Sequence, residues 1–183
     1  MQAHASVLGR KDTHAFEELM ETQLTKVYRL CCWLVKDSTA AEDITQEVFI
    51  QAYKHLDSFR GESQIETWIY RIAVNESKRY LRSWSFRKLF YFSQPKSIEH
   101  TDVESEVMNK VEADRLERLV YALPFRHRQL IVLYYYQELS AEAIAQILGM
   151  KVGAVYTGLH RAREKLKKRL IAEEGGEWTF IKG

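Results

Sequence analysis

The sequence contains little glycine or proline and no long hydrophobic run. Eight glycines and two prolines among 183 residues argue against a turn-dense β-sandwich or barrel and favour helices. Apolar stretches such as Leu30 to Val35 are far shorter than the ~20 residues that cross a bilayer, and Met1 to Lys11 lacks the apolar core of a secretory signal. We therefore expect an all-α protein that stays in the cytoplasm and does not insert into a membrane.

Groups that carry out chemistry are equally scarce. The two cysteines, Cys31 and Cys32, are adjacent, so they offer neither a disulfide staple nor the spacing of a zinc site, and we expect small apolar core residues. The six histidines are scattered, and the chain has no glycine-rich phosphate loop and no constellation of carboxylates. We therefore expect no catalytic residue, metal site, cofactor or small-molecule substrate, and no enzyme.

The charge is unevenly distributed along the chain. The formal net charge is only +2, which by itself does not indicate a nucleic-acid partner. Residues 114–183, however, hold twelve Lys and Arg against eight Asp and Glu, and Lys151 to Leu170 holds seven basic residues and one acidic residue, Glu164. The positive field is therefore concentrated near one end of the chain.

Apolar periodicity divides the chain into two helical groups. In residues 1–83, apolar residues recur at helical spacing on three segments, the second capped by Thr39 and the third by Ser63. Residues 84–113 lose this periodicity, and residues 114–183 regain it. The pattern predicts two small helical domains joined by a flexible linker.

The second group contains the pattern of a helix-turn-helix. Ser140 caps a short helix, Gly149 ends it where a left-handed backbone is needed, and a new helix begins within about three residues. The apolar stripe of this last helix leaves hydrogen-bonding side chains and then a basic tail on its other faces, which suits a DNA major groove flanked by phosphates. A generic helical hairpin with a solvated basic face has the same pattern, so both interpretations stay open here.

The third segment of the first group has one side that is amide, basic and aromatic. Opposite its apolar face lie Arg71 and Asn75, with Tyr70 beside them. Aromatic rings stack on unpaired bases and basic groups neutralise phosphate, which is the chemistry of single-stranded nucleic-acid binding. A core position for Tyr70 and a solvated Arg71 are the alternative. The second segment instead carries an acidic edge around Glu42, which either faces water or docks a basic protein partner.

Two ordered sets of motifs resemble one known family. Ala41 to Tyr53, Phe59 and Thr67 to Asn75 resemble region 2 of the extracytoplasmic-function sigma factors of bacterial RNA polymerase, in the sigma-70 family. The resemblance implies a sigma factor that binds core RNA polymerase, directs it to specific promoters and promotes promoter opening. The motifs that resemble region 4 follow in the right order: Leu123-Pro124, Leu139-Ser140, Ile144-Ala145, Leu148-Gly149 and Leu159 to Arg163.

The resemblance also implies a role for each recognition surface. The edge that would dock on the clamp helices of the polymerase comprises Asp43, Gln46, Glu47, Phe49 and Ile50. The surface that would open the promoter minus-ten element and hold an extruded base comprises Ser58, Phe59, Arg60, Gly61, Glu62, Ser63, Gln64, Thr67, Trp68, Tyr70, Arg71, Asn75, Lys78 and Arg79. The surface that would read the minus-thirty-five element comprises Ser140, Lys151, Gly153, Ala154, Tyr156, Thr157, His160, Arg161 and Arg163.

The family further implies an organisation and a regulator. Residues 1–83 would form region 2, residues 84–113 a linker that threads toward the RNA path of the polymerase, and residues 114–183 region 4. An anti-sigma factor would clasp both domains and hide their polymerase-binding faces until a stress signal releases the chain.

The recognition helix departs from the family pattern. Lys151 stands where the family commonly has a capping serine or proline, and Gly158 stands inside the helix. The lost cap costs about 1 kcal/mol, and the glycine about as much again relative to alanine. Since Ala154 and Tyr156 also differ from the family, base readout is expected to depend on Tyr156, Thr157, His160 and Arg161.

Two other classes of function are alternatives to this interpretation. A DNA-binding repressor or activator, with the first bundle as a dimerisation or sensing module, predicts tight duplex binding without polymerase. A pure interaction protein that sequesters a partner predicts that substitution of Tyr156 and Arg161 leaves function intact.

Overall fold

The structure, a computed structural model, describes residues 13–59, 63–90 and 115–174. Within these ranges the regular elements are all helical, which confirms the predicted fold class. None of the helices in the described ranges has the length and apolar character needed to cross a membrane. Some sequence predictions fall outside the described part of the chain, namely those on Arg60, Gly61, Glu62 and residues 91–113.

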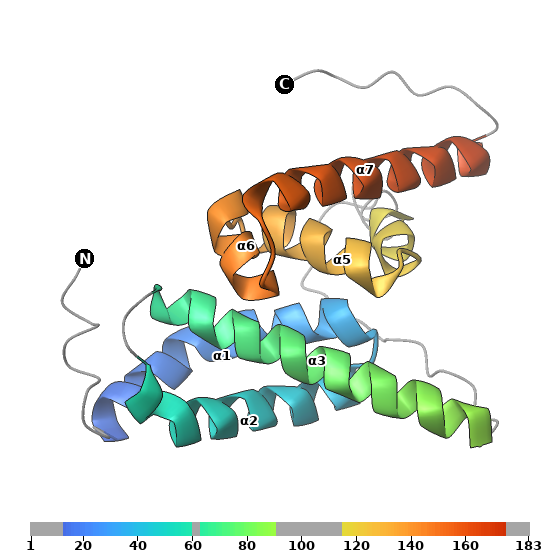
Figure 1. The fold of residues 1–183 in the computed structure, drawn as a ribbon. Coiled ribbons are helices and arrows are strands. Elements are labelled where there is room, and N and C mark those ends of the chain that lie inside the picture. Colours follow the sequence, from blue (N-terminus) through green and yellow to red (C-terminus); the bar gives the residue numbers. More distant parts are fainter. Residues whose placement is uncertain (1–12, 60–62, 91–114, 175–183) are drawn as a thin grey trace, which may run out of the picture.

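The first part of the chain forms an N-terminal lobe of packed helices (Figure 1). Apolar side chains at helical spacing fill the space between them, and Val27, Val48 and Ile69 are fully buried. The last helix continues into the range where the sequence predicts the linker. The elements of this lobe are α1 (Thr13–Val35), α2 (Ser38–His55), the short 3-10 helix η1 (Leu56–Ser58) and α3 (Ile65–Phe90).

Helix α2 starts earlier than the sequence predicts. The residue that caps it is Asp37, whose Oδ1 accepts a hydrogen bond from the Ala40 N–H at 3.0 Å. The prediction of Thr39 as the cap is therefore wrong. Aspartate and threonine are both good capping residues, but a carboxylate also interacts favourably with the positive end of the helix dipole.

The last part of the chain forms a C-terminal lobe. Its helices surround Leu133 and Leu159, which are both fully buried. One turn has the wider π-helical geometry, in which the Gln137 N–H donates to the Val132 carbonyl. The elements are a helical segment over residues 115–121, α5 (Phe125–Ile131), the π-helical turn η2 (Val132–Tyr136), α6 (Ala141–Leu148) and α7 (Val152–Glu174).

Helices α6 and α7 form the predicted helix-turn-helix. Ser140 caps α6, because its Oγ accepts a hydrogen bond from the Ala143 N–H at 3.2 Å. Gly149 ends α6 with a left-handed backbone, φ 61°, a conformation that glycine adopts without steric cost. Both local predictions are confirmed.

A close approach between α5 and α7 explains the glycine inside the recognition helix. A Cβ placed on Gly158 would lie 2.5 Å from Cδ1 of Leu130. Leu130 is itself buried, so its side chain has little room to move away. Gly158 therefore weakens the local helix but allows α7 to pack closely on α5.

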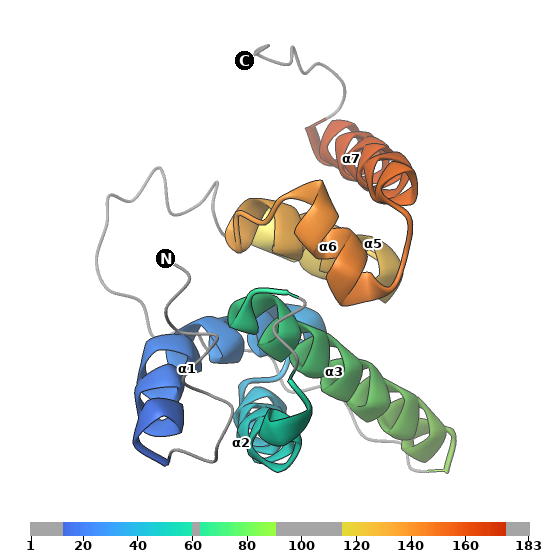
Figure 2. The same cartoon turned by 60° about the vertical axis from the view of Figure 1, so that its left-hand side comes forward.

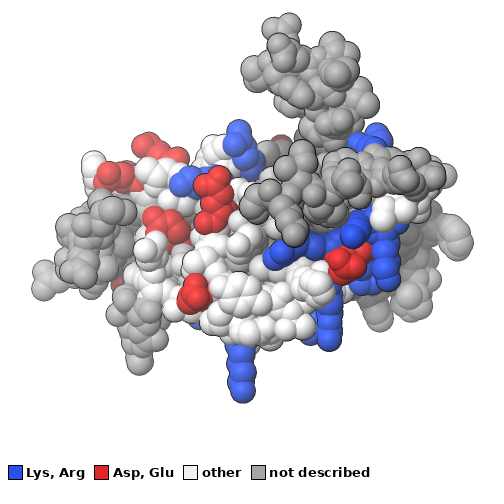
Figure 3. All heavy atoms as spheres, turned by 90° about the horizontal axis from the view of Figure 1, so that it is seen from above, with Lys and Arg blue, Asp and Glu red and all other residues white. Residues whose placement is uncertain are grey.

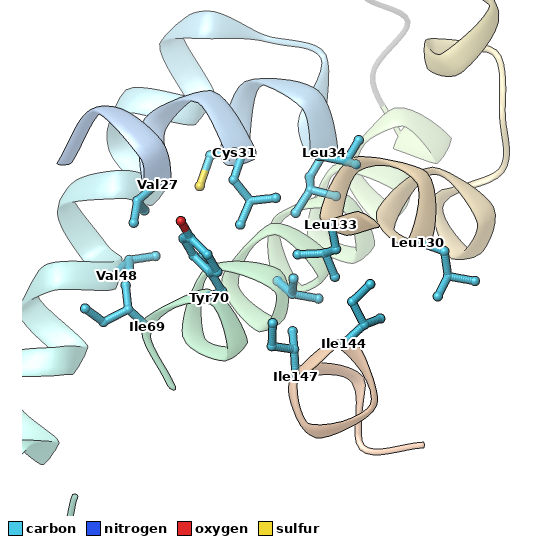
Figure 4. Packing of buried hydrophobic residues seen from close by; sticks show 14 of the residues in the cluster. Val27, Cys31, Leu34, Val48, Ile69, Tyr70, Leu130, Leu133, Ile144 and Ile147 are labelled. Carbon is cyan, nitrogen blue, oxygen red and sulfur yellow. The ribbon is translucent and has the colours of Figure 1, made fainter. Parts of the chain in front are cut away.

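The two lobes pack against each other through a continuous apolar core. Helix α3 lies against α6, and α1 lies against α5 and η2 (Figures 1 and 2). Leu34 at the end of α1 faces Leu133, near Ile144 and Ile147 of α6 (Figure 4). The periodicity of the sequence, which separates the two helical groups, does not predict this packing.

Candidate nucleic-acid and polymerase interfaces

The predicted polymerase-binding edge lies on α2 and is only partly at the surface. Asp43 and Gln46 are exposed, and Ile50 is 46% exposed. Phe49 is 5% exposed and belongs to the core of the lobe. The exposed edge is therefore the combination of acidic, amide and apolar side chains at Asp43, Gln46 and Ile50.

Glu47, also predicted on this edge, connects α2 to α3. Its Oε1 accepts a hydrogen bond from Gln51 Nε2 at 2.7 Å and lies 3.8 Å from Arg79 Nη2. Arg79 forms a second ion pair with Glu76 on its own helix. Burial raises the pKa of Glu76, and Arg79 opposes that rise. Because two carboxylates already face its guanidinium, Arg79 is less available for phosphate than the sequence predicts.

Packing divides the predicted minus-ten face of α3. Arg71, Asn75 and Lys78 are exposed, but Thr67 and Tyr70 are only 5% and 4% exposed. The Tyr70 ring lies among the core side chains (Figure 4), and burial raises its pKa to about 12. Because α1, α2 and α6 all contact α3, its buried sector is wider than its apolar stripe. Thr67 and Tyr70 are therefore not at the surface in this structure.

An aromatic pair lies at the start of α3. The half-buried Trp68 packs on Phe59, with ring centroids 5.3 Å apart. The backbone N–H of Trp68 donates to the carbonyl of Gln64 at 3.2 Å, which joins the first turn of the helix to the segment before it. In that segment Ser63 is half-buried and Gln64 is exposed. Of the predicted minus-ten loop, Phe59, Ser63 and Gln64 are thus described with their side chains, and Ser58 only by its backbone.

Helix α7 presents its predicted residues at the surface. Tyr156 is 54% exposed, and Thr157 Oγ1 donates to the Gly153 carbonyl at 2.9 Å, which leaves the hydroxyl free to accept. The Lys151 side chain has no acceptor atom to cap the helix, so only its carbonyl engages the first turn. Ser140 Oγ accepts the capping hydrogen bond of α6, which still leaves its hydroxyl hydrogen able to donate. The exposed residues are Lys151, Gly153, Ala154, Tyr156, Thr157, His160, Arg161 and Arg163.

A basic hollow of about 1020 Å³ lies between α3 and the C-terminal lobe. Glu164 is the acidic residue among the described residues that line it. Seen from above, Lys and Arg gather on the right-hand side of the molecule (Figure 3). We call this site the basic hollow, and its Lys, Arg and His residues are Lys78, Arg126, His127, His160, Arg161, Lys165 and Lys168.

The basic hollow includes groups that sequence patterns do not identify. Burial lowers the pKa of the half-buried His127, and the nearby Lys165, Arg126 and Arg161 lower it further. Its Nδ1 has no hydrogen-bond partner among the described residues. Arg126 stands at the start of α5, far along the chain from the recognition helix, so only the packing of α5 on α7 reveals it. Lys168 belongs to the basic tail of α7, which the sequence pattern does not assign to a particular site.

Two family models match the chain, one for each lobe. Residues 19–86 match the model of Sigma-70 region 2, and residues 113–166 match the model of Sigma-70, region 4. Their order and separation are those of the two motif sets in the sequence.

Curated relatives match most of the chain. The ECF RNA polymerase sigma factor SigW of Bacillus subtilis is 33% identical over 172 residues, which cover 87% of this chain and 90% of the relative. The ECF RNA polymerase sigma-E factor of Escherichia coli K12 is 36% identical over 171 residues, which cover 87% and 88%.

Solved structures share the fold. CnrH, solved in complex with the cytosolic domain of CnrY, gives a TM-score of 0.71 at 22% identity over 94% of this chain and 98% of that chain. The sigma factor RpoE of Bartonella quintana, solved with the anti-sigma factor NepR, gives a TM-score of 0.71 at 22% identity over 85% and 96%.

Proposed function

Because this chain belongs to the extracytoplasmic-function sigma factors of the sigma-70 family, we propose that its two lobes divide promoter recognition between them. A sigma factor is an initiation factor and not an enzyme: the chain binds core RNA polymerase and directs it to promoters. The exposed, basic side of α7, in the lobe that matches region 4, is the observation that carries the assignment of the DNA surfaces.

The C-terminal lobe reads the minus-thirty-five element as duplex. The start of α7 enters the major groove, where Tyr156, His160 and Arg161 contact base edges. Lys165 and Lys168 follow on the same helix and neutralise phosphates, a contribution that is independent of sequence and weakens as salt rises. Ser140 supports this surface by capping α6, and its exposed hydroxyl donates its hydrogen to a phosphate.

The N-terminal lobe holds the minus-ten element as an opened strand. Arg71, Asn75 and Lys78 offer an amide and two cations to a single strand, and the Trp68 and Phe59 pair lies at the helix start for base stacking. Extruding a base from the duplex costs a few kcal/mol. Contacts to the extruded base and the binding of polymerase offset that cost.

The exposed edge of α2 docks on the polymerase clamp. Its carboxylate at Asp43 complements a basic partner helix, and the exposed Ile50 adds apolar area to the contact. We expect Asp43→Arg to abolish co-purification with core polymerase. Glu21→Arg on α1, an exposed acidic residue away from this edge, is the matched control and should leave co-purification unchanged.

Regulation and organisation complete the proposal. Residues 1–83, 84–113 and 114–183 act as region 2, linker and region 4. An anti-sigma factor binds the chain, by analogy with the RpoE relative that was solved with NepR. The chain acts in the cytoplasm, where RNA polymerase transcribes the genome, and takes no small-molecule substrate.

Transcription in vitro tests the proposed function. Purified core polymerase is supplied with genomic templates, with and without the chain. We expect discrete start sites only when the chain is present, and we expect Arg161→Ala to weaken initiation at them while Arg29→Ala, at an exposed position on α1, leaves it unchanged. Random initiation in every reaction contradicts the proposal, and tight duplex binding without polymerase would favour a repressor instead.

A further inference from the structure

The floor of the basic hollow is apolar. Leu130 of α5 is buried, and its Cδ1 would lie 2.5 Å from a Cβ placed on Gly158 of α7. Both residues line the hollow, so the two helices touch at its floor. The half-buried apolar side chains that complete this floor are Phe125, Leu148 and Met150.

The rim of the hollow is basic and poorly neutralised. Its cations are exposed, and the ion pairs found among the described residues do not include any of them. Glu164 is the one carboxylate among the described residues that line the hollow. Uncompensated charge of one sign around a concave surface attracts an ion of the opposite sign. The cations of the rim are Arg126, Arg161, Lys165 and Lys168 of the C-terminal lobe, with Lys78 added from α3.

A half-buried imidazole lies among these cations. Burial lowers the pKa of His127, and Lys165, Arg126 and Arg161 lower it further, so these charges lie close to the ring. Its Nδ1 is buried without a hydrogen-bond partner among the described residues, which costs free energy. An anion in the hollow would neutralise the cations and supply acceptor oxygens to the imidazole.

The size and lining of the hollow suit a small molecule better than a duplex. Its volume of about 1020 Å³ is at the upper end of the range of ligand pockets, about 300–1,000 Å³, and such pockets combine apolar walls with a few convergent polar groups. A duplex presents phosphates to a basic rim and keeps the faces of its bases stacked, so it has nothing to place on an apolar floor. A free nucleotide has an exposed base face as well as phosphates.

We propose that the basic hollow binds a nucleoside triphosphate, with its base over Phe125 and Met150 and its phosphates at Arg126, Lys165 and Lys168. The nucleotide is a ligand and not a substrate, and none of its bonds breaks. Because Lys165 and Lys168 are also the proposed phosphate contacts of the minus-thirty-five duplex, the bound nucleotide excludes that duplex from α7. This exclusion rests on the proposed function, whereas nucleotide binding is a property of the chain alone.

Calorimetric titration of the full chain at one ionic strength tests the site with three probes. These are ATP, inorganic tripolyphosphate, which carries at least as much negative charge but no base, and AMP, which has the base but a single phosphate. We expect ATP to bind about tenfold more tightly than either. Tripolyphosphate binding as tightly as ATP would overturn the proposed site, because cations alone would then account for the affinity. Equal binding of AMP and ATP would overturn the role of the rim.

Two matched variants test where ATP binds. Arg126→Ala, at an exposed residue of the rim, should weaken ATP binding about tenfold, as expected for the loss of a hydrogen bond to a charged group. Arg118→Ala removes an exposed arginine of the same lobe that does not line the hollow, and it should leave ATP affinity unchanged. Equal losses in the two variants would mean that ATP is attracted by general surface charge, which contradicts the proposal.

A competition measurement tests the exclusion separately. In fluorescence anisotropy with a labelled promoter duplex found by transcription, ATP should release the duplex from the chain, and AMP at the same concentration and ionic strength should not. A duplex that stays bound at saturating ATP overturns the exclusion. The calorimetric pattern supports the site even if the chain gives no transcription start sites, and a failure of ATP to bind overturns the site even if transcription succeeds.

Discussion

The two helices proposed to contact DNA, α3 and α7, differ in how much of their surface the fold covers. Helix α7 packs on α5 and α6 within one lobe, so its predicted residues all remain exposed. Helix α3 contacts α1, α2 and α6, and only part of its predicted face reaches the surface. The comparison teaches that a polar stripe in the sequence indicates a binding surface only where other helices pack on one side of the helix that carries it. Where helices pack on several sides, part of the polar stripe is buried.

The largest expected effect is a loss of stability on substitution of Tyr70, which tests whether this part of α3 is buried. Since its ring is buried in the core, Tyr70→Ala should lower the free energy of unfolding by about 3–5 kcal/mol, as for other buried aromatic residues. Arg71→Ala, one residue further along α3 but exposed, should leave stability within about 0.5 kcal/mol and impair promoter opening. Urea unfolding measures the first effect and permanganate footprinting the second. Equal stability of the two variants would place Tyr70 at the surface.

A second effect tests why α7 tolerates a glycine. Gly158→Ala should destabilise the chain, because the clash with buried Leu130 costs about 1–3 kcal/mol and exceeds the gain of about 1 kcal/mol in helix propensity. Leu130→Ala alone should also destabilise, through the cavity that it leaves. Thermal unfolding of the double variant should show that Gly158→Ala is harmless or stabilising in the Leu130→Ala background. Additive losses would contradict the close approach.

A third effect compares the two DNA surfaces directly. Arg161→Ala should weaken binding to the minus-thirty-five duplex by about 1–3 kcal/mol and relax its sequence preference, whereas Lys168→Ala should weaken all duplexes alike and reduce the salt dependence. Fluorescence anisotropy at several salt concentrations distinguishes the two. The contrast fails if both variants lose sequence preference equally.

The smallest effect lies at the turn after α1. Lys36 has φ 64°, where an L-residue loses about 1–2 kcal/mol and glycine almost nothing, so Lys36→Gly should raise the melting temperature. Burial, together with the nearby charges of Arg128 and Arg169, lowers the pKa of Lys36 to about 8. Between pH 8 and 10.5 the unfolded chain binds more protons at this residue, so stability should rise with pH. In Lys36→Gly this rise should be smaller, which thermal unfolding across that range can check.

Local chemistry made several features predictable. The side chain of Ser140 favours the N-cap of a helix, and the backbone of Gly149 favours the left-handed position that ends one. Both residues have these roles in α6. Cys31 is fully buried, as expected of a small apolar residue. The exposed side of α7 was predictable from its apolar stripe, because the helices that pack on that stripe lie close to α7 in the sequence.

Features created by distant segments were not predictable. Asp37 replaced Thr39 as a cap because two good capping residues stand almost together, and only the backbone geometry decides between them. The burial of Tyr70 follows from the packing of several helices around α3. Arg128 donates a hydrogen bond to the carbonyl of Leu34, 94 residues away along the chain. A sequence pattern gives no signal for such a contact.

The central claim is that two lobes of one chain read two separate promoter elements. Selection of active promoters from a randomised template pool, transcribed by core polymerase with this chain, tests it most directly. We predict two preferred sequence blocks about 25 base pairs apart, or about 85 Å of duplex, and we predict that Arg161→Ala loses the preference in the upstream block only. Selected promoters without a second block, or loss of both blocks in Arg161→Ala, would contradict the claim.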